Sequence, residues 1–260
     1  MILSLTRNSK PAFFVGLFLL IIPNLHLWTS FIGKESILFV ALVVMTEKLL
    51  QRRIKSASFV LSFLLIALIR PHVAVVLLVA LMIAYMWKGN LGVKEKMGVG
   101  VISLFCFLGI YLLLKKIAFI RTNPWKRIIH IYDYHIKGLK KTDAYVPLDE
   151  YHLPYKIFTF YFRPLPFEKT GWLYQIWSIE NLILLLISGG VFYIAVRNFK
   201  TIKWGLYEVF ASLTILLLAV MYVYAYANYG LIARTKIMAM PFLYIFMVKI
   251  FAQVIPREPN

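Results

Sequence analysis

The sequence predicts an all-α fold: a polytopic transmembrane helical bundle of about eight spans with one large extracytoplasmic loop. First, 61% of its 260 residues are hydrophobic, whereas soluble domains are about 45–50% apolar. Second, these residues gather in blocks of roughly 12–22, and about 20 helical residues cross a bilayer core. Third, the blocks are continuous apolar runs rather than alternating segments. Since lipid leaves no water to satisfy backbone polar groups, the blocks are expected to be helices.

The first region, residues 1–117, is predicted to be an N-terminal bundle of about five spans. Its first block is preceded by Arg7 and Lys10 without a small-residue cleavage site, which favours an uncleaved first helix kinked at Pro23 over a signal peptide. A basic turn follows the second block, and another follows the fourth. The five blocks are Pro11–Trp28, Ser36–Met45, Ala57–Ile69, Val73–Trp87 and Met97–Leu114.

Residues 118–176 differ from the rest of the chain because they are rich in charge, Tyr, His and Pro and are too polar to span a membrane. They are predicted to form the extracytoplasmic loop. The last region, 177–260, is predicted to be a C-terminal bundle of about three spans. Its blocks are Leu182–Val196, Leu206–Tyr226 and Ile237–Phe251.

The net charge of +18 is best explained by cytoplasmic loops enriched in Lys and Arg and by anionic lipid surfaces. Nucleic-acid binding is not expected, because no basic run accompanies a soluble aromatic fold. With the N-terminus in the cytoplasm, the basic turns 47–56, 88–96 and 197–203 face inward. Every unusual polar residue then falls on the outer side, and long loops translocate regardless of their charge.

Glu35, Arg70 and His72 lie in the first two outer turns. Glu35 begins an apolar helix, where an acid is favoured by the helix dipole; as a functional group it is a candidate general base. Arg70 either snorkels to the interface or clamps an anion with its bidentate guanidinium. His72 is a second candidate for the base.

Arg234 and Lys236 lie near the last outer turn, against the usual bias of basic residues to the cytoplasm. Two cations there indicate either lipid-headgroup contact or an anionic partner. No metal site or other cofactor is expected: Cys106 is the only cysteine, and no His spacing on a helix comes with a third ligand.

The segment Phe158–Glu168 combines aromatic residues with two prolines and ends in a charged residue. Aromatic residues at this level usually form the interfacial belt of a membrane protein. The alternatives are stacking on sugar faces or covering a lipid carrier. Arg163 in this segment is a further candidate for binding an anion.

Five short motifs together resemble a bacterial family, the multi-spanning membrane proteins of O-antigen and exopolysaccharide gene clusters, which are similar to Wzy-type polymerases and to glycosyltransferases of the GT-C type. The resemblance runs from about Pro23 to Pro241, and known members are longer at the N-terminus. The motifs are Gly33–Ser36, Arg70–His72, Phe162–Glu168, Glu180–Asn181 and Asn228–Gly230 with Arg234.

The resemblance implies a multi-pass protein of the bacterial cytoplasmic membrane whose partners are the lipid bilayer and a polyprenyl-linked saccharide. It implies glycosyl transfer from an undecaprenyl-pyrophosphate-linked donor on the outer face. Arg70, Arg163, Arg234 and Lys236 would then bind the pyrophosphate. Two other classes stay open, a transporter or flippase of an anionic lipid-linked substrate and a non-enzymatic scaffold. The sugar, its linkage and the oligomeric state do not follow from the sequence.

Overall fold

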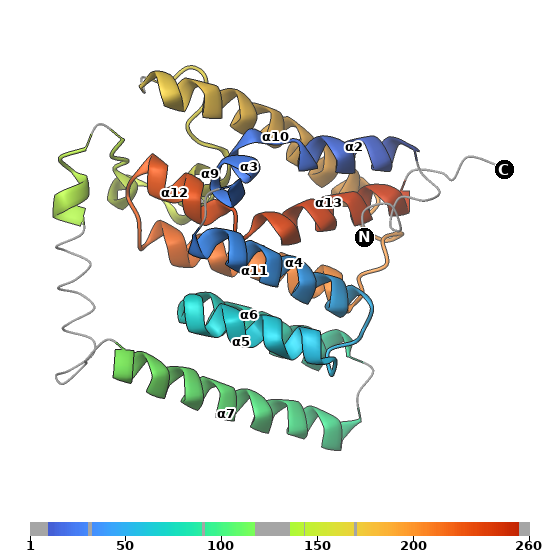
Figure 1. Ribbon diagram of the computed structural model, residues 1–260. Coiled ribbons are helices and arrows are strands. Elements are labelled where there is room, and N and C mark those ends of the chain that lie inside the picture. The colour runs from blue at the N-terminus through green and yellow to red at the C-terminus, as the bar shows by residue number, and fades with distance from the viewer. Residues whose placement is uncertain are drawn as a thin grey trace.

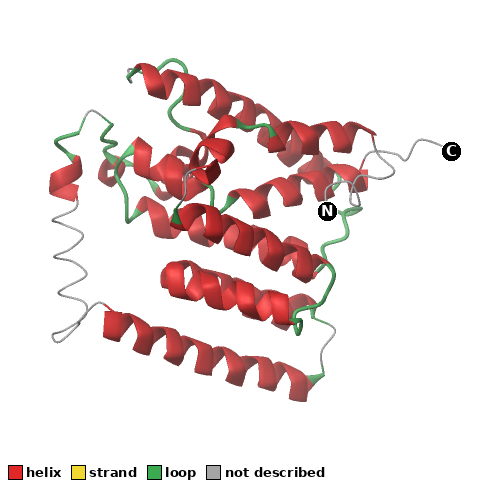
Figure 2. Ribbon diagram, viewed as in Figure 1, coloured by secondary structure: helices red, strands yellow, loops and turns green. Residues whose placement is uncertain are grey.

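The computed structural model describes residues 10–30, 33–89, 92–117, 136–142, 144–168 and 171–254. Within these ranges the regular elements are helices, and Figure 2 shows no strand. The all-α prediction is confirmed for this part of the chain. The predicted loop is covered only in part, since its residues 118–135 lie outside the described residues.

The longer helices lie side by side and run between two ends of the bundle (Figure 1). In chain order the elements are α2 (Lys10–Leu20), α3 (Pro23–Ser30), α4 (Lys34–Leu50), α5 (Ala57–Ile69), α6 (Pro71–Lys88), α7 (Val93–Ile117), the 3₁₀ turn η1 (Leu148–Glu150), α9 (Leu153–Phe162), α10 (Trp172–Arg197), α11 (Leu206–Val223), α12 (Tyr229–Lys236) and α13 (Met240–Val254).

Two bent helix pairs interrupt the bundle. The axes of α2 and α3 differ by 43° across a short break, and those of α12 and α13 differ by 59°. Pro23 opens α3, as the predicted kink requires, because proline cannot donate the backbone hydrogen bond that would continue the helix. The polar segment predicted as the last outer turn instead forms α12, which Asn228 caps by accepting from the backbone N–H groups of Gly230 and Leu231.

Within the described residues, three helices are long and apolar enough to cross a membrane: α6, α10 and α11. The count rises to five if each bent pair is one span, and α5 is a shorter apolar helix. This agrees with the coarse prediction of a helical membrane protein. The total of eight spans stays a prediction.

The core lies around α11, which packs against α6, α9 and α13. Phe210, Leu218 and Tyr222 are fully buried there. The outward faces of α7 and α10 are apolar and exposed: Phe105 is 68% and Phe192 is 71% accessible. A helix that is apolar on its outer face suits a lipid environment and not water.

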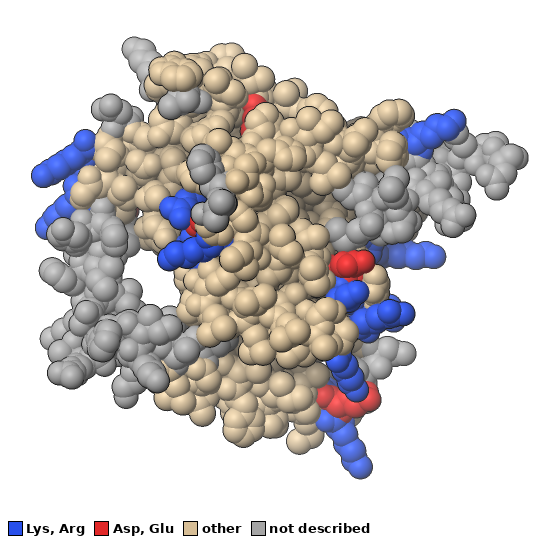
Figure 3. Space-filling view, in the orientation of Figure 1, with Lys and Arg blue, Asp and Glu red and all other residues tan. Residues whose placement is uncertain are grey.

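Charge is concentrated at the two ends of the bundle. Because α5 ends at Ile69 and α6 returns from Pro71, Arg70 lies at the end opposite the 51–56 turn; we refer to the two as the Arg70 end and the basic end. Figure 3 shows blue side chains along the basic end and a broad tan surface between the ends. The Lys and Arg residues of the basic end include Arg52, Arg53, Lys55, Lys88, Arg197, Lys200 and Lys203.

Candidate functional site

Three predicted site residues meet at the Arg70 end. Glu35 Oε1 accepts a hydrogen bond of 3.0 Å from Arg70 Nη2 and one of 2.9 Å from Arg234 Nε. Arg234 Nη2 bonds the same oxygen. We call Glu35, Arg70 and Arg234 the Glu35 cluster. It joins the start of α4, the α5–α6 break and α12, which lie far apart in sequence.

The local chain explains this meeting. Pro71 stands at the first turn of α6, where its missing N–H costs nothing, and it ends α5 so that Arg70 is left between two helices. Glu35, in the first turn of the neighbouring helix α4, lies opposite Arg70 and accepts its hydrogen bond. Arg234 stacks its guanidinium 5.8 Å from the centre of the Trp28 ring, which fixes its direction.

The cluster carries a net positive charge and is partly open. Two guanidinium groups share one carboxylate, so one unit of positive charge is unbalanced. The side chains of Glu35 and Arg70 are 9% and 14% accessible, whereas that of Arg234 is 37% accessible. The cluster therefore has donors to spare for an incoming anion, chiefly on Arg234.

His72 does not join the Glu35 cluster by any described contact. Its Nε2 lies 3.4 Å from the hydroxyl of Tyr222, and the two rings meet edge to face at 5.9 Å. Tyr222 in turn donates to the sulfur of Met238. This arrangement is the packing expected of a histidine near a helix interior, two residues along α6 from Arg70.

Arg163 belongs to a second group, which we call the Arg163 network. It forms a bidentate ion pair with Glu168, with Nε–Oε1 and Nη2–Oε2 distances of 2.7 Å each. Its Nη1 donates to the hydroxyl of Tyr151 at 3.1 Å, and Tyr229 donates to Glu168 Oε2 at 2.6 Å. The network holds the segment after α9 against η1 and α12.

The ion pair shifts both ionisations in the direction of the charged forms. Burial alone would raise the pKa of Glu168, but hydrogen bonds from Arg163, Tyr229 and the Leu165 amide outweigh it and hold the pKa below 4.5. Burial alone would lower the pKa of Arg163, but its bonds to Glu168 and Tyr151 raise it above its ordinary value. Both groups are therefore charged at neutral pH.

We expect protein stability to fall in acid through Glu168. A group whose folded pKa is depressed stabilises the folded state fully above its unfolded pKa, and that stabilisation is lost as the pH falls through the folded pKa. Thermal denaturation of the purified protein is expected to show stability falling below about pH 4.5. The fall should be shallower for Glu168→Gln and unchanged for the control Glu150→Gln, which alters an exposed carboxylate. Equal acid sensitivity of wild type and Glu168→Gln would contradict this.

Lys236 is buried away from the Glu35 cluster. Its Nζ donates to Asn181 Oδ1 at 2.6 Å and to the carbonyl of Tyr161 at 3.2 Å. Nearby, Glu180 Oε2 accepts the backbone N–H of Asn24 at 2.8 Å. We call Asn24, Glu180, Asn181 and Lys236 the buried polar set. It lines a cavity of about 10 Å³, roughly the space of one water molecule, together with Arg163.

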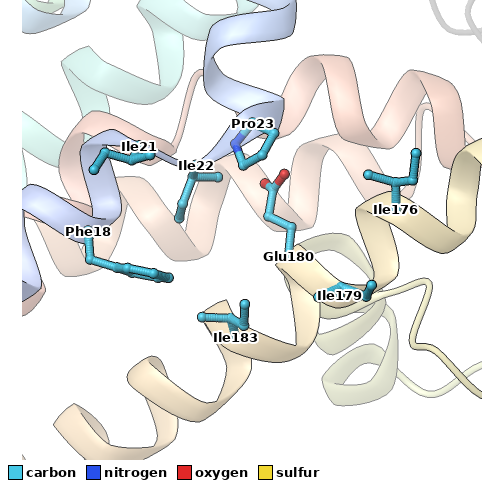
Figure 4. A pocket seen from close by; sticks show the side chains of 8 residues that line it. All are labelled: Phe18, Ile21, Ile22, Pro23, Ile176, Ile179, Glu180 and Ile183. Carbon is cyan, nitrogen blue, oxygen red and sulfur yellow. The ribbon is translucent and has the colours of Figure 1, made fainter.

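Glu180 also borders an apolar groove of about 300 Å³ between α2, α3 and α10. Figure 4 shows its carboxylate directed toward Pro23 among isoleucine side chains. A carboxylate in such surroundings is costly unless it is paired. The groove and the small cavity thus share one acidic side chain.

The structure brings together Glu35, Arg70 and Arg234, while Arg163, His72 and Lys236 each have other partners. Arg163 and Lys236 share only the small cavity. Sequence reasoning missed the partners Trp28, Tyr151 and Asn24, which no local pattern marks. It missed a further ion pair at the basic end, where Lys249 Nζ lies 2.6 Å from Glu208 Oε1; the spacing of that pair follows only from helix packing.

The described residues contain no group of three or more His, Cys, Asp or Glu side chains placed to hold a metal ion. Comparison of the chain with models of protein families, with curated proteins and with solved structures finds no match.

Proposed function

We propose that this chain is an integral membrane protein of cell-envelope polysaccharide biosynthesis. It transfers or polymerises sugars from an undecaprenyl-pyrophosphate-linked donor on the outer face of the bacterial cytoplasmic membrane. In this proposal the chain has about eight spans, and residues 118–176 form the extracytoplasmic loop. The basic end then faces the cytoplasm, as the positive-inside rule requires.

The observation that carries the proposal is the Glu35 cluster: two arginines from distant segments converge on one carboxylate at the Arg70 end. An arginine near the hydrocarbon is costly, and such residues usually mark a pathway or a ligand site. The cluster keeps both guanidinium groups ordered in advance while leaving a net positive charge. It is thus prepared for an anion at the membrane surface, which a pyrophosphate headgroup would supply.

This geometry suits glycosyl transfer because departure of the sugar leaves negative charge on the pyrophosphate. Donors that are already oriented toward that charge stabilise the transition state without reorganisation. Arginine binds phosphate oxygens in a bidentate manner. In this role Glu35 orients the two arginines.

The general base is less well defined. Glu35 accepts from two guanidinium groups, and such bonds favour its charged form and weaken it as a base. His72 packs on Tyr222, two residues along α6 from Arg70. Both residues stay predicted candidates, and the geometry favours an orienting role for Glu35.

A second candidate function is transport of an anionic lipid-linked substrate. The buried polar set favours it, because Asn24 and Lys236 lie on the two bent pairs and meet Glu180 and Asn181 of α10. Broken helices with buried polar groups are typical of transporter binding sites. The Glu35 cluster, however, lies at one end of the bundle. A substrate that approaches from that side would reach it directly, which suits transfer on one face of the membrane better than transport across it.

The test is reconstitution of the purified protein in liposomes with an undecaprenyl-pyrophosphate-linked oligosaccharide. We expect longer saccharides and released undecaprenyl pyrophosphate, without an ion gradient. Movement of the intact donor between leaflets, with no change in saccharide length, would contradict the transferase and support transport. If a preparation that binds the donor shows neither sugar transfer nor movement of the donor, both the transferase and the transporter are contradicted. The non-enzymatic scaffold would then be the remaining class.

A further inference from the structure

A large apolar groove lies on the side of the bundle between α10, α11 and α13. It encloses about 640 Å³ and is lined almost wholly by apolar side chains, a size in the range of roughly 300–1,000 Å³ typical of ligand pockets. Its lining residues on α10 run from Leu185 to Val196. At 1.5 Å per residue this is roughly 17 Å, comparable to the roughly 15 Å depth of one leaflet.

The groove opens beside the basic end. Phe199 and Trp204 line it, and they bracket the α10–α11 turn that carries Lys200 and Lys203. The turn is fixed by bonds from the Thr201 and Ile202 amides to the Asn198 carbonyl. The cations Arg197, Lys200 and Lys203 are exposed there. Trp204 is placed as interfacial tryptophans are, between headgroups and hydrocarbon.

We infer that this groove and the α10–α11 turn form a binding site for an anionic phospholipid, with an acyl chain in the groove and the phosphate headgroup over Lys200 and Lys203. Charge complementarity selects this occupant. Glu208, the described acid closest to this turn in sequence, is paired with Lys249 and accepts the Gly205 amide, so it does not neutralise the exposed cations.

The site is separate from the Glu35 cluster, which lies at the opposite end of the bundle. It has both parts that a two-chain lipid needs: an apolar channel and a cationic surface at its mouth. Each Lys or Arg near a membrane surface favours an anionic lipid by about fivefold. Two lysines together are expected to give a preference of roughly 25-fold over a zwitterionic lipid.

The test measures spin-labelled phosphatidylglycerol and phosphatidylcholine bound to the purified protein in detergent micelles. We expect the protein to prefer phosphatidylglycerol, and Lys200→Gln with Lys203→Gln to remove most of that preference. The matched control, Lys137→Gln with Lys140→Gln, also removes two positive charges but far from the groove; it should leave the preference unchanged.

A pair of neighbouring glycines tests the groove itself. A Cβ added at Gly189 or at Gly190 would meet no atom within 4 Å, but of the two only Gly189 lines the groove. Gly189→Phe is expected to lower immobilisation of both lipids, and Gly190→Phe to leave it unchanged. Equal binding of the two lipids by wild type, or full lipid binding by Gly189→Phe, would overturn the assignment.

Discussion

Arg234→Ala is expected to lower the rate of sugar transfer by about 100- to 1,000-fold, the loss typical of removing one preorganised donor from an anionic transition state. Arg234 is the most accessible member of the Glu35 cluster, so the substitution removes the proposed contact with the pyrophosphate while Glu35 keeps Arg70 as its partner. The measurement is release of undecaprenyl pyrophosphate in liposomes. Chain length of surface polysaccharide in the corresponding strain gives a second readout.

Two further variants separate the chemistry of Arg234 from a loss of charge. Arg234→Lys keeps the charge but loses the bidentate fork, so it should recover only part of the rate. Arg197→Ala removes an equal charge at the basic end and should transfer sugar normally. A normal rate for Arg234→Ala, at normal protein levels, would remove the Glu35 cluster from the site.

Glu168→Ala is expected to destabilise the folded protein by about 3–5 kcal/mol, because it leaves the largely buried guanidinium of Arg163 without its counter-charge. Arg163 and Glu168 are 13% and 21% accessible and are joined by two short bonds. Tyr229 also loses its acceptor. Titration of the detergent-solubilised protein with sodium dodecyl sulfate, followed by tryptophan fluorescence, measures the change.

The double variant Arg163→Met with Glu168→Leu is the control for this prediction. Replacing both partners with apolar side chains removes the uncompensated charge, so the double variant should be more stable than Glu168→Ala alone. If the single and double variants unfold at the same detergent concentration, the stabilisation does not come from the ion pair.

The helical class and the break at Pro23 follow directly from the sequence, because apolar block length and proline chemistry act locally. For Glu35, Arg70 and Arg234, the sequence predicts only that all three lie on the same side of the membrane. Their shared carboxylate cannot be derived from the sequence, because it depends on how the fold places α12 beside the start of α4 and the α5–α6 break.

Arg163 and Lys236 show the limit of a prediction from charge. Each is basic and lies in an outer segment by sequence, yet Arg163 bonds Glu168 and Lys236 bonds Asn181 in the interior. The sequence alone does not show whether a basic residue has a partner within the fold. The partner Glu168 is close in sequence, but Asn181 is 55 residues away, and only the fold brings it near.

The Glu35 cluster is completed late in synthesis of the chain. Arg234 leaves the ribosome 199 residues after Glu35, which at bacterial and eukaryotic translation rates is roughly 10–40 s. During that interval Glu35 and Arg70 can pair as one acid with one base and no surplus charge. A nascent chain that stalls before residue 234 therefore carries Glu35 and Arg70 without the surplus positive charge that Arg234 brings to the Glu35 cluster.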